Sequence, residues 1–188
     1  MGVAGGTNNA DFVLLAGVAG LLAGAFSMAA GEYVSMRSQR DVYEHQINLE
    51  RIEIEMWPEK KEEELSLIYQ AKGLPKEEAE IIAKRLMADP EIALDTMARE
   101  ELGLNPSELG SPWRASFSSF AAFVTGALIP IIPYILGAND LAIPLSAVLS
   151  AGALLTVGGT LAWMTNRSAI WGALRMTLAG GAAATVTF

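Results

Sequence analysis

The acidic residues between Leu49 and Leu65 are the part of this sequence best suited to binding cations. Glu50 and Glu53 are three residues apart, so they share one face if the segment is helical. After Trp57-Pro58, a second acidic run follows at Glu62-Glu63-Glu64. Carboxylates this dense repel one another unless water, a Lys or Arg side chain, or a bound cation neutralises them. From the spacing alone, a solvated acidic face is the simpler interpretation and a cation site is the alternative.

An oxygen-rich cluster of this kind suits Fe²⁺, Mn²⁺, Mg²⁺ or Ca²⁺. The sequence contains no cysteine, which excludes disulfides, thiolate zinc sites and iron–sulfur clusters. A ferritin-type di-iron oxidase expects Glu-x-x-His pairs. The single histidine, His45, is not in such a pair and is expected at the surface. We therefore predict no enzyme and no prosthetic group.

The charged residues are concentrated in one stretch of the chain. Of 21 acidic residues, 18 lie between Asp41 and Glu108, and 11 of the 13 basic residues lie between Arg37 and Arg114. The rest is nearly uncharged, and the whole chain is 52% hydrophobic with a mean hydropathy of +0.33. This pattern is typical of a membrane protein with one water-exposed insert. The net charge of −8 argues against nucleic acid as a partner.

Four apolar segments are long enough to cross a bilayer, which needs ~20 helical residues. We expect spans over residues 11–36, 116–136, 141–164 and 170–188. Pro130 and Pro133 should kink or interrupt the second of them near its far end. The predicted fold class is all-α, a polytopic helical membrane protein with an inserted helical domain. Its predicted parts are an N-terminal stub (1–10), the first span (11–36), the insert (37–112) and three further spans (113–188).

Helical signals continue through the insert. The pattern after Ser38 has no break, so we expect the first span to project into water as one rod to about Met56. Three short helices should follow over residues 59–72, 75–88 and 90–102, each marked by a proline at its start or a glycine at its end. The apolar residues that can form their shared core are Ile68, Ala71, Ile81, Ile82, Leu86, Ile92, Leu94 and Met97.

The distribution of Lys and Arg predicts the orientation. They lie in the insert and in the turn with Arg167 and Arg175, and none lies in residues 1–10 or 137–140. The positive-inside rule therefore predicts a cytosolic insert.

Glu32, near the end of the first span, is either an ion-path residue or a carboxylate close to the headgroups. Gly20 and Gly24 form a GxxxG motif, which favours close helix packing and suggests a homodimer.

The sequence contains the strings GAFSMAAGEYVSMRSQRDVYE, REELGLNP and GALIPIIPY, with the acidic helices between the first two. In combination, these features resemble those of the vacuolar iron transporter family. The resemblance covers nearly the whole chain. It implies five membrane helices with a cytosolic metal-binding domain between the second and third. Residues 11–36 would be the second helix, and residues 1–6 would be the stub of a first helix that the chain lacks. Met28 matches a methionine that lines the family's translocation path between two subunits, and we place Glu32 in the same path.

The resemblance also implies a set of metal ligands in the insert. Glu50 and Glu53 match the family's first glutamate pair, and Glu64 matches the last residue of the second pair. The partner position is Lys61 here, which departs from the family pattern, and Glu62 is a less certain substitute. Met97 and Glu101 match the methionine and glutamate of the final helix. They are four residues apart and so share a helical face. A thioether among the ligands favours a transition metal.

The sequence thus predicts a transporter that moves Fe²⁺, or Mn²⁺, out of the cytosol in exchange for protons. The insert would capture the metal. The expected partners are membrane lipid, divalent transition metal ions and a second copy of the chain, and the expected location is a bacterial or archaeal plasma membrane. The alternatives are a membrane-tethered metal-binding or sensing module that does not transport, and a truncated transporter fragment.

Overall fold

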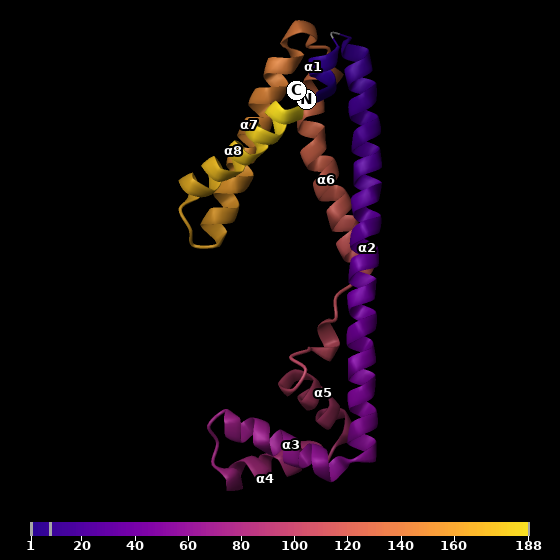
Figure 1. Cartoon of the computed structure of the whole chain (residues 1–188), viewed down its shortest axis with the longest axis vertical. Coiled ribbons are helices and arrows are strands. Elements are labelled where there is room, and N and C mark those ends of the chain that lie inside the picture. The colour runs from indigo at the N-terminus through magenta and orange to yellow at the C-terminus, as the bar shows by residue number, and fades with distance from the viewer. Residues whose placement is uncertain (1, 8, 188) are drawn as a thin grey trace. The chain divides into compact units, whose positions relative to one another are not determined.

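The computed structural model describes residues 2–7 and 9–187, with the side chain of Asn139 left out, so Met1 and Asn8 of the predicted stub and the final Phe188 lie outside the description. In the described residues every regular element is helical (Figure 1). The longer elements are α1 (Gly2–Gly6), α2 (Ala10–Met56), α3 (Pro58–Ala71), α4 (Lys76–Met87), α5 (Pro90–Glu100), α6 (Pro112–Ile135), α7 (Ala142–Met164) and α8 (Ala169–Thr187). Two 3₁₀ turns, η1 (Pro106–Glu108) and η2 (Asn139–Leu141), complete them. The all-α prediction is confirmed.

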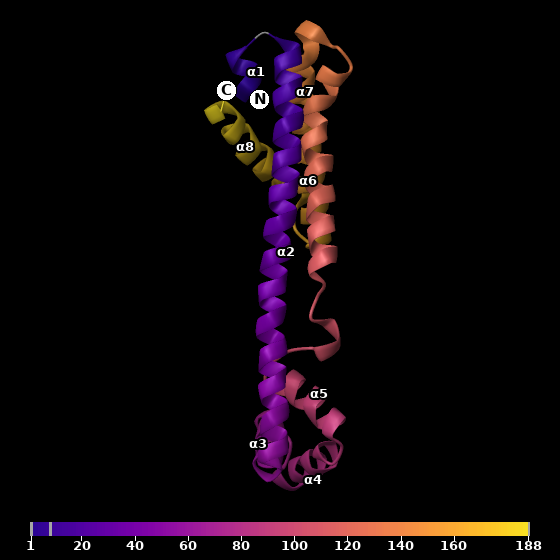
Figure 2. The same ribbon diagram turned by 90° about the vertical axis from the view of Figure 1, so that its right-hand side faces the viewer.

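The chain divides into two compact units. Residues 1–31 and 116–188 form one, which we call the membrane unit, and residues 32–115 form the other, which we call the insert unit. The helix α2 begins in the first and ends in the second. The helix α2 has 47 residues. Figure 2 shows it as one continuous helix, as the unbroken pattern after Ser38 predicts.

Among residues 2–7 and 9–187, three helices are long and apolar enough to span a membrane, by length and composition: α2, α6 and α7. They correspond to the first three of the four predicted spans. The fourth predicted segment, residues 170–188, is helical as α8 over its described part, but it is not among these three candidates.

Within the membrane unit, α7 and α8 pack closely through glycines. A Cβ atom built on Gly172 would lie 2.3 Å from the Cβ of Ala162 and 2.6 Å from the carbonyl oxygen of Gly158. Glycine at these positions therefore lets the two backbones approach, as in other membrane helix pairs. Figure 1 shows the two helices side by side.

The prolines of α6 do not end the helix, which runs through Pro130 and Pro133 to Ile135. The hydroxyl of Ser146 on α7 donates a hydrogen bond of 2.8 Å to the carbonyl oxygen of Pro130. Side-chain hydroxyls commonly satisfy backbone groups near a proline in a membrane helix. The two prolines were predicted to kink or interrupt the helix; they do not interrupt it, and a kink stays a prediction.

In the insert unit, prolines and glycines bound the short helices as the sequence predicts. Pro58 and Pro90 occupy first-turn positions of α3 and α5, where no backbone N–H is needed. The carboxylate of Asp89 caps α5 by accepting hydrogen bonds from the backbone N–H groups of Glu91 and Ile92. Gly73 and Gly103 have φ of +101° and +66°, a backbone conformation that glycine adopts without steric penalty.

The core of the insert unit differs in part from the predicted set. Its buried residues are Ile54, Leu65, Ala83, Ala93 and Met97, with Tyr69, Leu86, Met87 and Leu94 packed against them. Met97, Leu86 and Leu94 were predicted. Ala71, Ile81, Ile82 and Ile92 were predicted too, but they are exposed, and the predicted Ile68 is half-buried. The alanines of α4 and α5 face the core in place of Ile81, Ile82 and Ile92, and their small side chains let the helix backbones pack closely.

Candidate metal site in the insert

Four of the five predicted metal ligands converge on one point in the insert unit, and a lysine ammonium occupies that point. Glu50 and Glu53 lie near the end of α2, Lys61 and Glu64 lie on α3, and Glu101 caps the end of α5. The Lys61 Nζ atom lies 2.9 Å from Glu50 Oε1, 3.0 Å from Glu53 Oε2, 3.0 Å from Glu64 Oε2 and 2.9 Å from Glu101 Oε2. We call these five residues the Lys61 cluster.

The helices place these side chains by simple spacing. Glu50 and Glu53 are three apart on α2, and Lys61 and Glu64 are three apart on α3, so each pair shares a face. The break at Trp57-Pro58 turns the chain so that α3 brings Lys61 against α2. The packing of Met97 into the apolar core fixes the C-terminal end of α5, where Glu101 follows four residues later.

Burial is uneven across the cluster. The side chains of Lys61 and Glu50 are both only 4% exposed, whereas those of Glu53, Glu64 and Glu101 are 46%, 42% and 30% exposed. Glu50 Oε2 accepts a hydrogen bond from Lys61 at 3.1 Å, and Oε1 makes an ion-pair contact. Lys61 and Glu50 thus form a buried ion pair, and the other three carboxylates close the water-facing side.

The pKa values of the buried pair reflect this setting. Burial lowers the pKa of the Lys61 ammonium, but hydrogen bonds to Glu101, Glu50, Glu64 and Glu53 outweigh burial and raise that pKa above its usual range. Burial raises the pKa of the Glu50 carboxyl, and the hydrogen bond from Lys61 opposes that rise. Lys61 is therefore a permanent cation at neutral pH, and four carboxylates share its single charge.

The distances in the cluster are those of ammonium hydrogen bonds. Carboxylate oxygens bind hard divalent ions at about 2.0–2.6 Å, which is shorter than every contact to Lys61 Nζ. Over residues 2–7 and 9–187, no group of three or more His, Cys, Asp or Glu side chains is placed to hold a metal ion. A metal at this point would have to replace the ammonium and draw the carboxylates inward.

The remaining predicted ligands lie elsewhere. Met97 is fully buried with Ile54 and Leu65 in the apolar core. Glu62, the less certain ligand, is half-buried and lines a groove between α3 and α4 with Glu59 and Glu63. The predicted set of metal ligands stays a prediction. It comprises Glu50, Glu53, Glu64, Met97 and Glu101, with Glu62 as a less certain member.

The predicted path residues Met28 and Glu32 both lie on α2, and both are exposed in the single chain. The two glycines of the nearby GxxxG motif have different surroundings. A Cβ atom on Gly24 would lie 2.3 Å from the ring of Phe123 on α6. Gly20 lines a cavity that also involves α6. Gly24 therefore packs within the chain, whereas Gly20 is exposed with nothing within 4 Å of its missing Cβ, so only Gly20 of the motif is open to a second copy.

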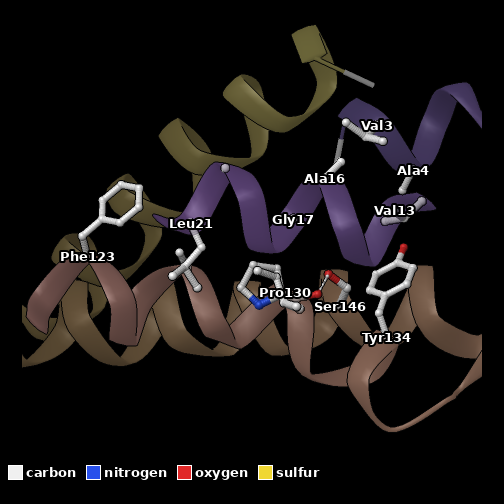
Figure 3. Close-up of a pocket in the computed structure, with 13 residues that line it drawn as sticks. Val3, Ala4, Val13, Ala16, Gly17, Leu21, Phe123, Pro130, Tyr134 and Ser146 are labelled. Carbon is white, nitrogen blue, oxygen red and sulfur yellow. Dashed lines mark hydrogen bonds between the residues drawn. The ribbon is translucent and has the colours of Figure 1, made fainter. Parts of the chain in front are cut away.

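The membrane unit contains one further hollow, shown in Figure 3, of about 240 Å³. It lies among α1, α2, α6 and α7, and its lining includes Gly17, Leu21, Pro130, Tyr134 and Ser146. No lining residue is charged. The Tyr134 hydroxyl is buried there without a hydrogen-bond partner among the described residues. An apolar cavity of this kind offers a divalent ion no charge compensation.

The sequence did not identify Lys61 as the centre of the cluster, although it identified the carboxylates around it. The spacing contains a signal: Lys61 lies three residues before Glu64 and three residues after Pro58, which starts α3. In the sequence pattern Lys61 replaces an expected ligand, whereas in the structure its side chain is long enough to place a cation among the carboxylates.

The fold and the cluster together define a polytopic helical membrane protein with an inserted helical unit that concentrates carboxylates around one cation. The chain belongs to the VIT family, whose family model matches residues 1–188. It is 38% identical to "Vacuolar iron transporter" of Acanthamoeba castellanii over 96% of this chain and 69% of that protein. It is 30% identical to "Vacuolar iron transporter 1" of Eucalyptus grandis and to the protein of the same name from Arabidopsis thaliana. Both comparisons cover all of this chain, with 76% and 75% of the two relatives.

Proposed function

We propose that this chain is a membrane transporter of Fe²⁺, with Mn²⁺ as a second cargo, that moves the metal out of the cytosol in exchange for protons. Members of the VIT family are transporters and not enzymes, and the match covers the whole sequence. The relatives named above carry iron transport in their names. Family membership over residues 1–188 is the observation that carries the proposal.

In this proposal the insert captures the metal. What supports it is the convergence of Glu50, Glu53, Glu64 and Glu101 on one cation position. Carboxylate oxygens suit Fe²⁺ and Mn²⁺. The captured ion would then pass to the membrane unit through a path that includes Met28 and Glu32.

The orientation and the location belong to the same proposal. The charge distribution favours a cytosolic insert, because the insert and the Arg167 turn carry the basic residues. We place the protein in a plasma membrane of a bacterium or archaeon. Relatives with the word vacuolar in their names come from Acanthamoeba castellanii, Eucalyptus grandis and Toxoplasma gondii. Those names do not support a plasma membrane, so this location is a proposal from the sequence.

A homodimer is also part of the proposal. Exposed apolar side chains of α2 within the membrane unit, among them Leu15, Leu22 and Phe26, leave a surface that a second copy can cover. Cysteine crosslinking tests it directly, since the sequence has no cysteine of its own. A cysteine in place of Leu22 should form a disulfide between two chains in native membranes. A purely monomeric band at every α2 position tested would reject the dimer.

Transport is tested with the full chain in sealed proteoliposomes. Fe²⁺ uptake should appear with an outward proton movement, and Glu50→Gln with Glu53→Gln should reduce the initial rate at low Fe²⁺ by at least tenfold. The matched control is Glu78→Gln with Glu80→Gln, two exposed acids outside the Lys61 cluster, which should leave the rate unchanged. Metal binding without any uptake would instead identify a tethered binding module.

A further inference from the structure

The Lys61 cluster contains its own cation. We propose that the Lys61 ammonium acts as a tethered cation at the metal position of the insert, so that a divalent ion binds there only by exchange with it. The inference rests on the proposed capture of metal by this cluster, and it adds a residue that controls the capture.

The Lys61 ammonium lies at the centre of the four glutamates and does not pair with one of them at the edge of the cluster. Five carboxylate oxygens from four glutamates lie within 3.1 Å of Lys61 Nζ. An ammonium has three N–H donors, fewer than these five oxygens, and Glu50 Oε1 is buried with no hydrogen-bond partner among the described residues. Octahedral Mn²⁺ and Mg²⁺ sites have six oxygens, so these five carboxylate oxygens and one water would complete such a site. The ammonium thus sits where such an ion would bind.

The charge balance favours exchange. Four carboxylates and one ammonium leave the cluster with a net charge of −3. A divalent ion in the same place would compensate one more charge and could bind the oxygens at shorter distances. Against this gain stands the loss of the buried contact between Lys61 and Glu50, so the ammonium competes with every ion that enters.

The same ammonium connects three helices. Its partners come from the end of α2, from α3 itself and from the end of α5. A carboxylate cluster without a cation would push these helices apart, because like charges at this distance repel. With Lys61 in place, the insert unit stays assembled when no metal is bound. The consequence is a site that is stable without metal and weak for metal.

The wild-type chain provides the first test. Purified full-length protein in detergent is treated with an amine-acylating reagent, and the modification of each lysine is measured by mass spectrometry with and without Mn²⁺. Lys61 is almost fully buried and should react slowly, while the adjacent Lys60 is exposed. Saturating Mn²⁺ should expel the Lys61 ammonium and raise its labelling at least fivefold, with Lys60 unchanged. Unchanged Lys61 labelling at saturating Mn²⁺ would overturn the exchange.

A variant pair provides the second test. Lys61→Met keeps the length of the side chain and removes its charge, and Lys60→Met makes the same change one residue away, outside the cluster. In chelator, Lys61→Met should unfold at a lower temperature than wild type and recover when Mn²⁺ is added. It should bind Mn²⁺ at least tenfold more tightly in calorimetry, and Lys60→Met should match wild type in both measurements. Equal Mn²⁺ affinities for Lys61→Met and Lys60→Met would reject the proposal, even if Lys61→Met were less stable.

Failure of this inference is distinguishable from failure of the proposed function. The inference depends on the ratio of Mn²⁺ affinities and on the labelling of Lys61. The transport proposal depends on Fe²⁺ uptake by the wild-type chain in proteoliposomes. If Lys61→Met proves too unstable to purify, the labelling of wild-type Lys61 decides the inference alone.

Discussion

The Lys61 side chain determines the charge at the centre of the insert. It carries one positive charge into a setting with four carboxylates, and it is the one buried cation among the described residues. Because removing one partner of a buried ion pair leaves the other charge uncompensated, such pairs are sensitive to single substitutions, with losses of about 3–5 kcal/mol. If one glutamate is removed, the other three still compensate the charge of Lys61. If Lys61 is removed, all four glutamates lose their cation.

The raised pKa of Lys61 gives a pH prediction. A cation whose folded-state pKa is raised contributes stability below its unfolded pKa, about 10.4 for lysine. That stability is lost only as pH rises through the higher folded value. We therefore expect the difference in unfolding temperature between wild type and Lys61→Met, measured in chelator, to be nearly the same at pH 7 and pH 9.5. A difference that disappears by pH 9.5 would show that the ammonium loses its proton in the folded chain.

Met97 allows the core role and the predicted ligand role to be separated. Its side chain is fully buried among Ile54, Leu65 and Ala93. Met97→Ala should lose about 2–5 kcal/mol of stability through a cavity, while Met97→Leu should lose less than about 1.5 kcal/mol. If the thioether is a ligand, Met97→Leu should weaken Fe²⁺ binding but not Ca²⁺ binding, since a thioether offers little to a hard ion. Calorimetry with both ions measures this. Equal effects on Fe²⁺ and Ca²⁺ would leave Met97 as a core residue only.

At the scale of elements, the sequence predicted the helices better than their faces. Pro58, Gly73, Pro90 and Gly103 mark helix ends by backbone chemistry that depends on few neighbours, so the predicted ends lie within a few residues of the observed ones. Which face of α4 points inward depends instead on packing between helices distant in sequence. The sequence therefore misplaced Ile81, and it left the position of the Lys61 side chain open.

The close packing of α7 and α8 gives a prediction at this scale. Gly172→Val places a side chain where backbone atoms of Gly158 already lie, so the helices must separate, and overpacking of this kind costs about 1–3 kcal/mol. Gly181→Val is the matched control on the same helix, because nothing lies within 4 Å of its missing Cβ. In detergent, Gly172→Val should lower the temperature of thermal aggregation by several degrees relative to Gly181→Val. Identical aggregation curves for the two variants would contradict the packing of α7 against α8.

For the whole molecule, chain continuity and charge together predict the topology. The insert unit connects the part of α2 in the membrane unit to the part of α6 in the membrane unit, and the turn near Asp140 joins α6 to α7. If α6 crosses the membrane, the insert and Asp140 lie on opposite sides. The positive-inside rule then places the insert in the cytosol, because residues 137–140 have no Lys or Arg.

Single cysteines test this topology cleanly, since the sequence contains none. In sealed, right-side-out vesicles, an impermeant maleimide should label Asp140→Cys and leave Glu78→Cys unlabelled until detergent is added. Both positions are exposed in the chain, so burial does not account for a difference. Arg167→Cys, in the turn between α7 and α8, should behave like Glu78→Cys if α7 also crosses the membrane. Labelling of Glu78→Cys and Asp140→Cys from the same face would show that α6 does not span the bilayer, and a cytosolic insert would then lose the argument that supports it.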